Sequence, residues 1–361
     1  MKVLIVFNHP APYKVSIFNE LAKYVDLTVI FERTKAKDRP DDFYINNNYN
    51  FNVIFLKDGY IGNEGSLSCG VRKYIKEHFR EYDHIVMNGY SHVAEIKAIN
   101  YLHRHHIRFS LLINGGIARN KEFFLKRRYK SKLISYADFY MSPSLNSDDY
   151  LTFYHANKDR IYRYPYSNLS EKELFKPQLD KVELRKELGL PLDKKIYVNA
   201  SQFIERKNNM QLLSLFKDRD DFLLLIGDGK ELDKYQAFIK DNNMSNVLIV
   251  PFQKKDQLFK YLQASDVFIS LAKWDIFGHT IVEALANHLP VIASKNINAA
   301  LEYVKDGYNG YVVDLENEQS IRDAIDNSKN INPKNCTESI KNNTFENCGK
   351  VLYDILAKEN M

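Results

Sequence analysis

The sequence predicts an α/β protein with two doubly wound domains, each a parallel sheet covered by helices on both faces. Its 361 residues suffice for two ordinary domains, and 45% hydrophobic residues can supply a core for each. Short aliphatic and β-branched runs alternate with helix-like segments, as in sheets with crossover helices. A polar stretch at 167–181 separates two such series. We therefore place the domains at 1–170 and 171–344, with a last helix at about 345–361 that can pack back on the first domain.

The first series supplies five predicted strands: VLIVF (3–7), LTVIF (27–31), NVIFL (52–56), HIVMN (84–88) and RFSLLIN (108–114). Segments such as VSIFNELAKYV and VAEIKAINYLHRH, which lie between them, have helical periodicity. The first run reaches Asn8 and Pro10 after five apolar residues, so we interpret it as a strand and not as a signal peptide. No run approaches the roughly 20 apolar residues of a membrane span.

The second series supplies six predicted strands: KIYVNA (195–200), FLLLIG (222–227), NVLIVP (246–251), DVFIS (266–270), PVIAS (290–294) and GYVVD (310–314). Helices such as KNNMQLLSLFK and KDQLFKYLQAS fall between them. The Asn-rich stretch at 327–345 predicts a surface connector. In sheets of this kind ligands bind beyond the carboxyl ends of the strands, so a site is expected in the loops that follow strands.

Composition narrows the function classes. The net charge of +5 is modest and locally concentrated, which favours a local anionic partner and argues against nucleic acid. The cysteines Cys69, Cys336 and Cys348 lack metal-ligand spacing and suit a reducing cytoplasm. The histidines of 103–106 have no fixed fourth ligand, so we predict no metal and no cofactor. No Gly-x-Gly-x-x-Gly follows the first strand, which argues against a dinucleotide dehydrogenase.

The stretch WDIFGHTIVEALANHLPV (274–291) directly follows a predicted strand and sets two carboxylates, Asp275 and Glu283, eight positions apart. Gly278 permits a sharp turn, and a helix is expected to start at His279 or Thr280. The free N–H groups and the dipole of that helix form an anion site.

Glu283, one turn inside this helix, could accept hydrogen bonds from a ribose diol. Asp275, in the loop before it, could meet the hydroxyls of a second sugar. The spacing therefore fits a sugar–diphosphate–ribose ligand. The alternative is a capped helix whose carboxylates only favour its N-terminus.

At these residues the sequence resembles the retaining nucleotide-sugar glycosyltransferases of family 4, which have the GT-B fold of two facing Rossmann-like domains. Their pattern is a carboxylate, any residue, Phe-Gly, four residues, then Glu-Ala, often followed by Gly-x-Pro-Val. The chain reads Asp275-Ile-Phe-Gly-His-Thr-Ile-Val-Glu283-Ala, then Asn287-His-Leu-Pro-Val. Asp275 replaces the Glu that is commoner at the first position of the pattern. Asn287 and His288 occupy the region where the family usually has Gly. ASDVFIS (264–270), LLLIGDGKELDKY (223–235) and EYVKDGYNGYVVD (302–314) also resemble the family.

The resemblance implies a role for each residue of the motif. Glu283 corresponds to the ribose-binding Glu and Asp275 to the acid at the donor sugar, while backbone contacts to sugar and diphosphate come from Phe277, Gly278, His279 and Thr280. In ASQFIERKNN (200–209) Lys207 takes the place of the phosphate-binding Lys of the family. Gln202 stands where the family has an Arg. Arg206 is therefore a candidate to supply the positive charge that Gln202 lacks. The alternative for Arg206 and Lys207 is a solvated helix start, although cations there oppose the helix dipole.

The first domain departs further from the family. Its first loop reads NHPAPYK (8–14) and ends in Pro12, Tyr13 and Lys14, which is similar to the Pro-x-Tyr-basic pattern of a polysaccharide-building subgroup, so we expect an acceptor-side loop. The alternative is a rigid turn pre-set by prolines. Where relatives place a His near the reacting centre, this chain has Asn114, followed by Gly115 and Gly116. Asn114 can hydrogen-bond a sugar or leaving group but cannot act as a general base.

The segment Asn120 to Tyr140 is predicted to be a basic amphipathic helix. Its apolar residues, Leu125, Tyr129, Leu133, Tyr136 and Tyr140, recur close to helical periodicity, and the remaining arc carries Lys126, Arg127, Arg128, Lys130 and Lys132. Two interpretations stay open: docking on an anionic membrane surface, or an ordinary solvated helix packed by its aromatic stripe.

The resemblance implies a hexosyltransferase of the cytoplasm or its membrane face. It would move a hexose-type sugar, with retention, from a UDP-linked donor to a lipid-linked oligosaccharide or to a surface polysaccharide of the capsule or exopolysaccharide type. The leaving diphosphate can itself take the proton, so Asp275, Lys207 and Asn114 would act without a side-chain nucleophile or metal. The alternatives are a nucleotide-sugar epimerase and a catalytically silent partner subunit.

Overall fold

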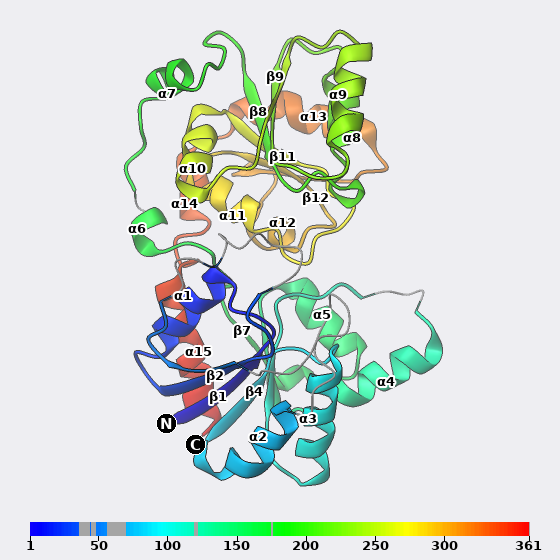
Figure 1. Ribbon diagram of the computed structural model, residues 1–361. Helices are drawn as coiled ribbons and strands as arrows, with labels where there is room; N and C mark the ends of the chain where they lie inside the picture. Colours follow the sequence, from blue (N-terminus) through cyan, green and yellow to red (C-terminus); the bar gives the residue numbers. More distant parts are fainter. Residues whose placement is uncertain (36–43, 45–47, 56–69, 119–121, 175, 361) are drawn as a thin grey trace. The chain divides into compact units, whose positions relative to one another are not determined.

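The computed structural model describes residues 1–35, 44, 48–55, 70–118, 122–174 and 176–360 (Figure 1). The chain divides into two compact units: unit 1 contains Met1–Ser170 and Asn342–Met361, and unit 2 contains Glu171–Lys341. Unit 2 is thus inserted between two parts of unit 1. The first boundary lies where the sequence places it, and the second lies three residues earlier than the expected 344.

Unit 1 alternates strands with helices. Its elements are β1 (Lys2–Phe7), α1 (Pro12–Leu21), β2 (Asp26–Phe31), β3 (Asn52–Phe55), α2 (Gly70–His78), β4 (His84–Met87), α3 (Val93–Arg104), β5 (Ser110–Leu112), α4 (Phe124–Ile134), β6 (Phe139–Ser142), α5 (Leu145–Phe153), β7 (Ile161–Arg163) and α15 (Phe345–Glu359). The described strands form one sheet in the order β3-β2-β1-β4-β5-β6-β7, and every paired neighbour is parallel.

The sheet of unit 1 is buried on both faces, which explains why its strands are continuous apolar runs. One face packs through Leu4, Val6 and Met87 against α2, α3, α4 and α5. Helices α1 and α15 lie on the other side of the sheet (Figure 1). Each large aliphatic side chain buried here stabilises the fold by about 1.5–3 kcal/mol relative to an exposed one.

Helix α15 returns to unit 1 and packs closely along α1. Thr344 starts the helix by accepting a hydrogen bond from the Asn347 N–H (3.2 Å). A Cβ added at Gly349 would lie 2.5 Å from the Cβ of Glu20, so the absent side chain sets how closely the two helices approach. At the far end Glu359 accepts a hydrogen bond from the Tyr162 hydroxyl (2.5 Å).

Unit 2 repeats the alternation. Its elements are α6 (Glu171–Leu174), α7 (Lys181–Glu187), β8 (Ile196–Ala200), α8 (Asn209–Phe216), β9 (Phe222–Ile226), α9 (Leu232–Asp241), β10 (Val247–Val250), α10 (Lys255–Ala264), β11 (Val267–Ser270), α11 (His279–Ala286), β12 (Val291–Ser294), α12 (Asn298–Tyr303), β13 (Gly310–Val313), α13 (Glu318–Asn327) and α14 (Lys334–Glu338). The sheet order is β10-β9-β8-β11-β12-β13, again parallel.

The core of unit 2 has the same two-sided construction. Helices α8, α9 and α13 cover one face through a cluster that includes Phe216, Tyr235 and Ile325. Helices α10 and α11 lie on the other side (Figure 1). Among the described helices of both units, none combines the length and apolar character needed to pass through a bilayer.

Three sequence expectations need correction. The predicted helix 120–140 is shorter, because α4 ends at Ile134 and Tyr140 belongs to β6. The stretch 327–345 is not a simple surface connector, since it contains α14 and buries Cys336 completely. Strands β6 and β7 were not expected, since the FYMS run lies in a helical pattern and IYR is only three residues long. Leu56, Cys69 and Asn120 lie outside the described residues.

Candidate functional site

The strand order of unit 2 reverses between β8 and β11, which lie side by side in the sheet. Doubly wound sheets bind ligands at this position, beyond the carboxyl ends of the two strands. The loop after β8 carries Arg206 and Lys207, and the loop after β11 carries Asp275. A backbone hydrogen bond from Lys273 N to Arg206 O (2.8 Å) joins the two loops.

Two cations converge on Asp275. The Lys207 Nζ atom lies 2.5 Å from Asp275 Oδ2, and the Arg206 Nη1 atom lies 3.6 Å from the same oxygen. Arg206 also stacks its guanidinium over the Trp274 ring, at 4.9 Å from the centroid. Although Arg206 and Lys207 are adjacent in sequence, both side chains therefore point to one place. Both cations are partly buried and paired with Asp275, so they are more than solvated side chains at a helix start.

The cations keep Asp275 ionised. Burial by itself would raise the pKa of this carboxyl, but the charge and hydrogen bond of Lys207, then Arg206 and the Phe277 N–H, outweigh burial and lower the pKa below its usual value. The site therefore holds one carboxylate between two positive groups.

Hydrogen bonds from the chain after β12 fix the loop that carries Asp275. Asp275 N donates to Asn296 O (3.1 Å), and Asn298 Nδ2 donates to Ile276 O (2.6 Å). Phe277 O accepts from Ala299 N (2.7 Å), while its N–H donates to Asp275 Oδ1 (3.4 Å). Both backbone groups of Phe277 are thus used inside the loop, and this residue orients the site more than it offers free contacts.

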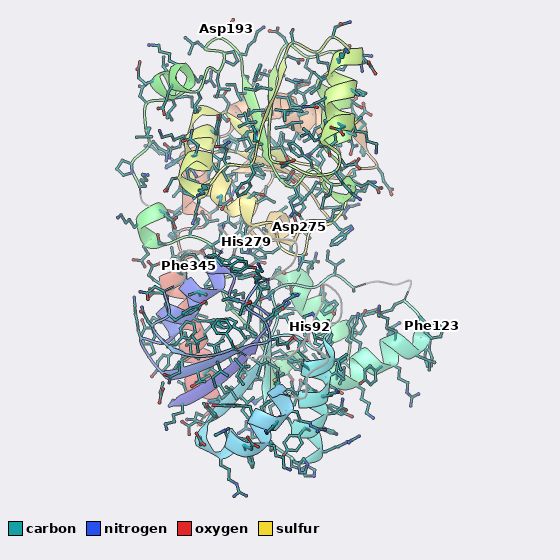
Figure 2. The ribbon with its side chains drawn as sticks, in the orientation of Figure 1. His92, Phe123, Asp193, Asp275, His279 and Phe345 are labelled. Atoms are coloured by element: carbon teal, nitrogen blue, oxygen red, sulfur yellow. The ribbon has the colours of Figure 1, made fainter. Side chains whose placement is uncertain are left out.

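Helix α11 begins immediately after this loop. Gly278 has φ of +94°, and a Cβ at this position would lie 2.5 Å from Ile297 Cγ2, so glycine is required both for the turn and for the close approach. No side chain caps this helix in the described chain. His279, the first residue of the helix, lies near Asp275 (Figure 2). The N-terminal N–H groups, among them those of His279 and Thr280, and the positive end of the dipole belong to this first turn.

Glu283 lies one turn inside α11 and is 8% exposed.

The end of the same helix shows why the usual Gly of the motif is replaceable. His288 adopts φ of +59°, the left-handed conformation that Gly usually takes after a helix. Asn287 accepts a hydrogen bond from Gln263 Nε2 (2.9 Å) and donates to Glu283 O (2.8 Å), which secures the helix from the inside.

Gln202 is exposed in the loop after β8. Its neighbours are pinned by the glycine turn after β9: Phe203 N donates to Asp228 O (2.7 Å), and a Cβ at Gly227 would lie 1.9 Å from Ser201 O. The turn thus presents Gln202 to solvent on the same loop as Lys207.

Comparisons with known proteins agree with this geometry. A family model described as "Glycosyl transferases group 1" matches residues 180–344. The N-acetyl-alpha-D-glucosaminyl L-malate synthase of Bacillus anthracis is 26% identical over 162 residues, which are 44% of this chain and 42% of that protein. The UDP-Gal:alpha-D-GlcNAc-diphosphoundecaprenol alpha-1,3-galactosyltransferase of Escherichia coli is 28% identical over 185 residues, 47% of each protein. The chain is thus similar, over residues 180–344, to group 1 glycosyl transferases. It spans less than half the length of these curated relatives.

The solved structure of HepE from Anabaena, in complex with UDP, matches the whole fold with a TM-score of 0.80 and 17% identity, covering 99% of this chain and 100% of that one. The similarity supports the GT-B fold for both units of this chain.

The first loop of unit 1 differs from the acceptor-side expectation at Lys14. Pro12 begins α1 and Tyr13 is half-buried, but Lys14 is 1% exposed. Its Nζ lies 4.1 Å from the centroid of the Tyr166 ring and 5.5 Å from that of Phe7. Lys14 is therefore a core residue and cannot present its ammonium group to an acceptor. Burial lowers its pKa to about 7.

Asn114 pairs with Asn88, which follows the neighbouring strand β4. Its Nδ2 donates to Asn88 Oδ1 (3.1 Å), and Asn88 Nδ2 donates to Leu112 O (2.7 Å). The pair thus fixes both amides at the carboxyl end of the sheet. Gly115 has φ of +136° and is half-buried. Gly116 is buried, and a Cβ there would lie 2.4 Å from Tyr150 Cγ, so this residue packs and does not line an open surface.

Sequence reasoning missed a second polar cluster in unit 1, formed by Glu32, His92 and Glu95. The His92 Nδ1 atom lies 3.4 Å from Glu32 Oε2 and 3.6 Å from Glu95 Oε1. Burial lowers the pKa of His92, but the two glutamates outweigh it and raise the pKa to about 9. The sequence signal was limited to Glu32, which directly follows the strand predicted at 27–31, because His92 and Glu95 lie four and seven positions beyond the strand predicted at 84–88.

Helix α4 exposes an apolar and basic end. Phe123, Phe124 and Leu125 are 71%, 68% and 61% exposed (Phe123 is labelled in Figure 2). Of the five basic residues expected on this surface, Lys126, Arg128 and Lys132 are exposed. The other two pack inward.

Lys130 donates to Glu122 Oε1 (3.0 Å) and to the Tyr154 hydroxyl (3.1 Å). Arg127 lies over the Phe153 ring at 4.0 Å. These two residues therefore belong to the packing of unit 1 and not to its open surface.

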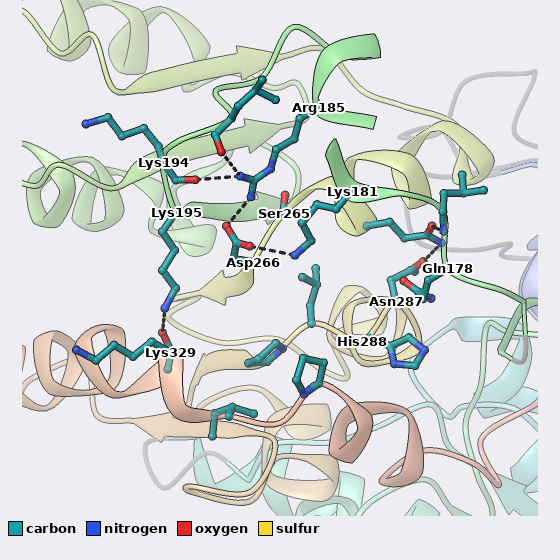
Figure 3. A pocket seen from close by; sticks show the side chains of 18 of the residues that line it. Gln178, Lys181, Arg185, Lys194, Lys195, Ser265, Asp266, Asn287, His288 and Lys329 are labelled. Carbon is teal, nitrogen blue, oxygen red and sulfur yellow. Dashed lines mark hydrogen bonds and ion pairs between the residues drawn. The ribbon is translucent and has the colours of Figure 1, made fainter. Parts of the chain in front are cut away.

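A cavity of about 650 Å³ in unit 2 lies at the opposite, amino end of the sheet (Figure 3). Internal ion pairs line it: Asp266 contacts Arg185 (2.6 Å) and Lys181 (3.0 Å) and accepts the Ile196 N–H (2.8 Å). Asp266, Arg185 and Lys181 thus satisfy one another inside the cavity. The candidate site remains the one at the carboxyl ends of β8 and β11.

Proposed function

We propose that this chain transfers a hexose-type sugar, with retention of configuration, from a UDP-sugar to a lipid-linked or surface-polysaccharide acceptor. Within this proposal unit 2 binds the donor and unit 1 binds the acceptor. The reaction belongs to the cytoplasm or the inner face of the plasma membrane and uses no metal or cofactor.

One observation carries the proposal: Arg206 and Lys207 converge beside the start of α11, with Asp275 between them and Glu283 one turn along the helix. Two cations and a helix N-terminus suit a diphosphate. Rising about 1.5 Å per residue, the helix carries Glu283 roughly 6 Å beyond those amides, a distance suited to a ribose diol.

Two relatives support the choice of donor and acceptor. HepE was crystallised with UDP, and the Escherichia coli relative is named for transfer from UDP-Gal to a diphosphoundecaprenol-linked sugar. Extending this chemistry to the present chain gives a UDP-sugar donor and a saccharide acceptor on a lipid carrier.

In the proposed mechanism the donor diphosphate takes over the cations that Asp275 now holds. Asp275 then turns to the hydroxyls of the donor sugar. The bond between C1 and the β-phosphate oxygen breaks, and the acceptor hydroxyl forms a bond to C1 on the same face. Its proton passes to the leaving phosphate oxygen, while Lys207, Arg206 and the α11 amides stabilise the developing negative charge. Asn114 hydrogen-bonds the sugar or leaving group.

Thermal-shift binding across UDP-, GDP-, dTDP- and ADP-sugars tests the donor site. We expect the UDP-sugar to stabilise the protein, by about 2.7 kcal/mol at a concentration of 100 Kd, and Glu283→Gln to weaken binding about tenfold or more. The matched control is Glu318→Gln, an exposed glutamate in the first turn of α13. If no nucleotide sugar stabilises the wild type, the donor-site proposal is wrong.

Product analysis separates transfer from its alternatives. A transferase consumes the donor only when acceptor is present, an epimerase converts the donor alone, and a silent subunit binds without turnover. Either of the last two results would replace the proposed activity.

Peripheral docking through α4 is a separate part of the proposal. Phe123, Phe124 and Leu125 would enter the interface, and each nearby basic residue adds about 1 kcal/mol at an anionic surface. Lys126→Glu with Arg128→Glu should reduce binding to anionic vesicles. Arg72→Glu with Lys76→Glu on the exposed face of α2 is the control with the same charge change. Equal binding to neutral and anionic vesicles would contradict docking.

A further inference from the structure

The cluster of Glu32, His92 and Glu95 joins loops from three positions of unit 1. Glu32 directly follows β2, His92 precedes α3 after β4, and Glu95 lies in the first turn of α3. Because β2 and β4 flank β1 in the sheet, the cluster bridges the two sides of the central strand. Among the described residues, these three side chains are the ones whose ligand atoms group closely enough to hold a metal ion.

The spacing fits a small cation. The ligand atoms all lie within 4.8 Å of one another, and His92 Nδ1 is 3.4 Å and 3.6 Å from its two carboxylate neighbours. Ligands held at about 2.0–2.1 Å in a tetrahedral site are separated by roughly 3.4 Å. A metal ion could therefore enter with small side-chain adjustments.

Glu95 is already held in one orientation. Its Oε2 accepts hydrogen bonds from Ser91 N (2.8 Å) and His92 N (3.0 Å), so Oε1 is the atom directed at the cluster. Gly89 leaves room for it, because a Cβ there would lie 2.7 Å from Oε1. Backbone donors of this kind orient metal-binding carboxylates.

Glu32 gives a second, independent indication of a ligand. It is 1% exposed, yet neither carboxylate oxygen has a hydrogen-bond partner within the described chain, and the same holds for His92 Nδ1. A buried carboxylate without hydrogen bonds costs several kcal/mol unless a cation compensates it. His92, 3.4 Å from Glu32, and the neighbouring Arg33 are the positive groups that act on Glu32, and a metal ion would take the place of the proton on His92 Nδ1.

We propose that Glu32, His92 and Glu95 bind one divalent first-row metal ion, Zn²⁺ or Mn²⁺, in unit 1. One imidazole with carboxylate oxygens suits these ions. The ion joins the loop after β2 to the start of α3. It is separate from the proposed sugar transfer, whose charges lie in unit 2, and it is tested without measuring activity.

The test uses the full chain, stripped of metal by chelation and titrated calorimetrically with Zn²⁺ and with Mn²⁺. We expect one equivalent to bind and to raise Tm. Co²⁺ in place of these ions should give a visible absorption band of a site with nitrogen and oxygen ligands. Glu32→Gln should weaken binding at least tenfold.

Glu81→Gln is the matched control, because Glu81 faces His78 at 2.8 Å on the exposed surface of the same unit. It should bind the ion as the wild type does. If Glu32→Gln does not fold, His92→Gln replaces it. Failure of the stripped wild type to bind Zn²⁺ or Mn²⁺ overturns the proposal, as does unchanged affinity in the folded variant.

Discussion

At the scale of the residue, Asp275 is the best example of a side chain whose partners decide its role. The sequence predicts Asp275 at the donor sugar and Lys207 at the phosphate, 68 positions apart. It does not predict their direct contact, because that depends on β8 and β11 being neighbours in the sheet.

Asp275→Asn should separate nucleotide binding from transfer. The amide has the same size but leaves Lys207 and Arg206 available to the diphosphate, so UDP binding should stay equal or tighten up to about tenfold. The transfer rate should fall about 10²-fold, as when one polar contact to the reacting groups is lost. Calorimetry with UDP and initial rates with a UDP-sugar measure the two effects.

Asp314→Asn removes a similar 2.5 Å pair, with Lys295, on the exposed surface of unit 2 and should change neither quantity. Weaker UDP binding by Asp275→Asn would mean instead that the carboxylate holds the two cations in place.

Lys14 shows what the sequence leaves open for one residue. The sequence Pro12-Tyr13-Lys14 suggested an acceptor contact, but nothing in it tells whether the third side chain of α1 turns inward. Its pKa, about 7 in the fold against 10.5 for an ordinary lysine, makes the inward position measurable.

Lys14→Met should have a larger free energy of unfolding than the wild type, and this difference should be largest at pH 7 and below. Between pH 7 and 10.5 the unfolded wild type keeps a proton that its folded form has lost, so wild-type stability rises with pH and the difference shrinks. At about 1.36 kcal/mol per pH unit the full change is on the order of 5 kcal/mol. Urea unfolding at pH 7 and 9.5 measures it. Lys240 is exposed, so the difference in free energy of unfolding between Lys240→Met and the wild type should not vary with pH. If the difference for Lys14→Met were also independent of pH, this would contradict a buried Lys14.

At the scale of the element, the sequence predicts most strands and helices, because parallel strands buried on both faces are uninterrupted apolar runs. Helix α11 starts at the expected His279. The ends of α4 and the presence of β6 were not predictable, since FYMS continues a helical spacing and becomes a strand only by pairing with β5 and β7.

Gly278→Ala should disturb the start of α11. Alanine at φ of +94° is strained, and its Cβ would meet Ile297 Cγ2 at 2.5 Å, so unit 2 should lose about 1–3 kcal/mol. UDP binding should weaken with it, because the α11 amides move. Gly189→Ala is the control: its φ is +65°, but no atom lies within 4 Å of the added Cβ. Equal losses for both would show that the close approach to Ile297 has no effect.

At the scale of the whole molecule, the sequence predicts two units and a final helix that can return to the first one. The closeness of that return depends on Gly349, whose importance no sequence pattern indicates. It arises only because α15 lies against the backbone of Glu20 and Leu21 in α1.

Gly349→Ala should destabilise unit 1 by about 1–3 kcal/mol, because overpacking moves α15 away from α1 despite the better helix propensity of alanine. Scanning calorimetry should show the transition of unit 1 moving to lower temperature while that of unit 2 stays in place. Lys350→Ala, one residue along on the exposed side, should leave both unchanged. If Gly349→Ala were more stable than the wild type, α1 and α15 would have enough space between them for the added methyl group.

The inserted position of unit 2 sets an order for folding on the ribosome. Unit 2 has all of its residues once Lys341 has emerged, whereas unit 1 still lacks α15. At about 5–20 residues per second, the roughly 190 residues that follow Ser170 take about 10–40 s to synthesise. During that interval the apolar side of α1 that α15 later covers is open to chaperones and proteases. The first part of the chain to be made therefore belongs to the last unit to be completed.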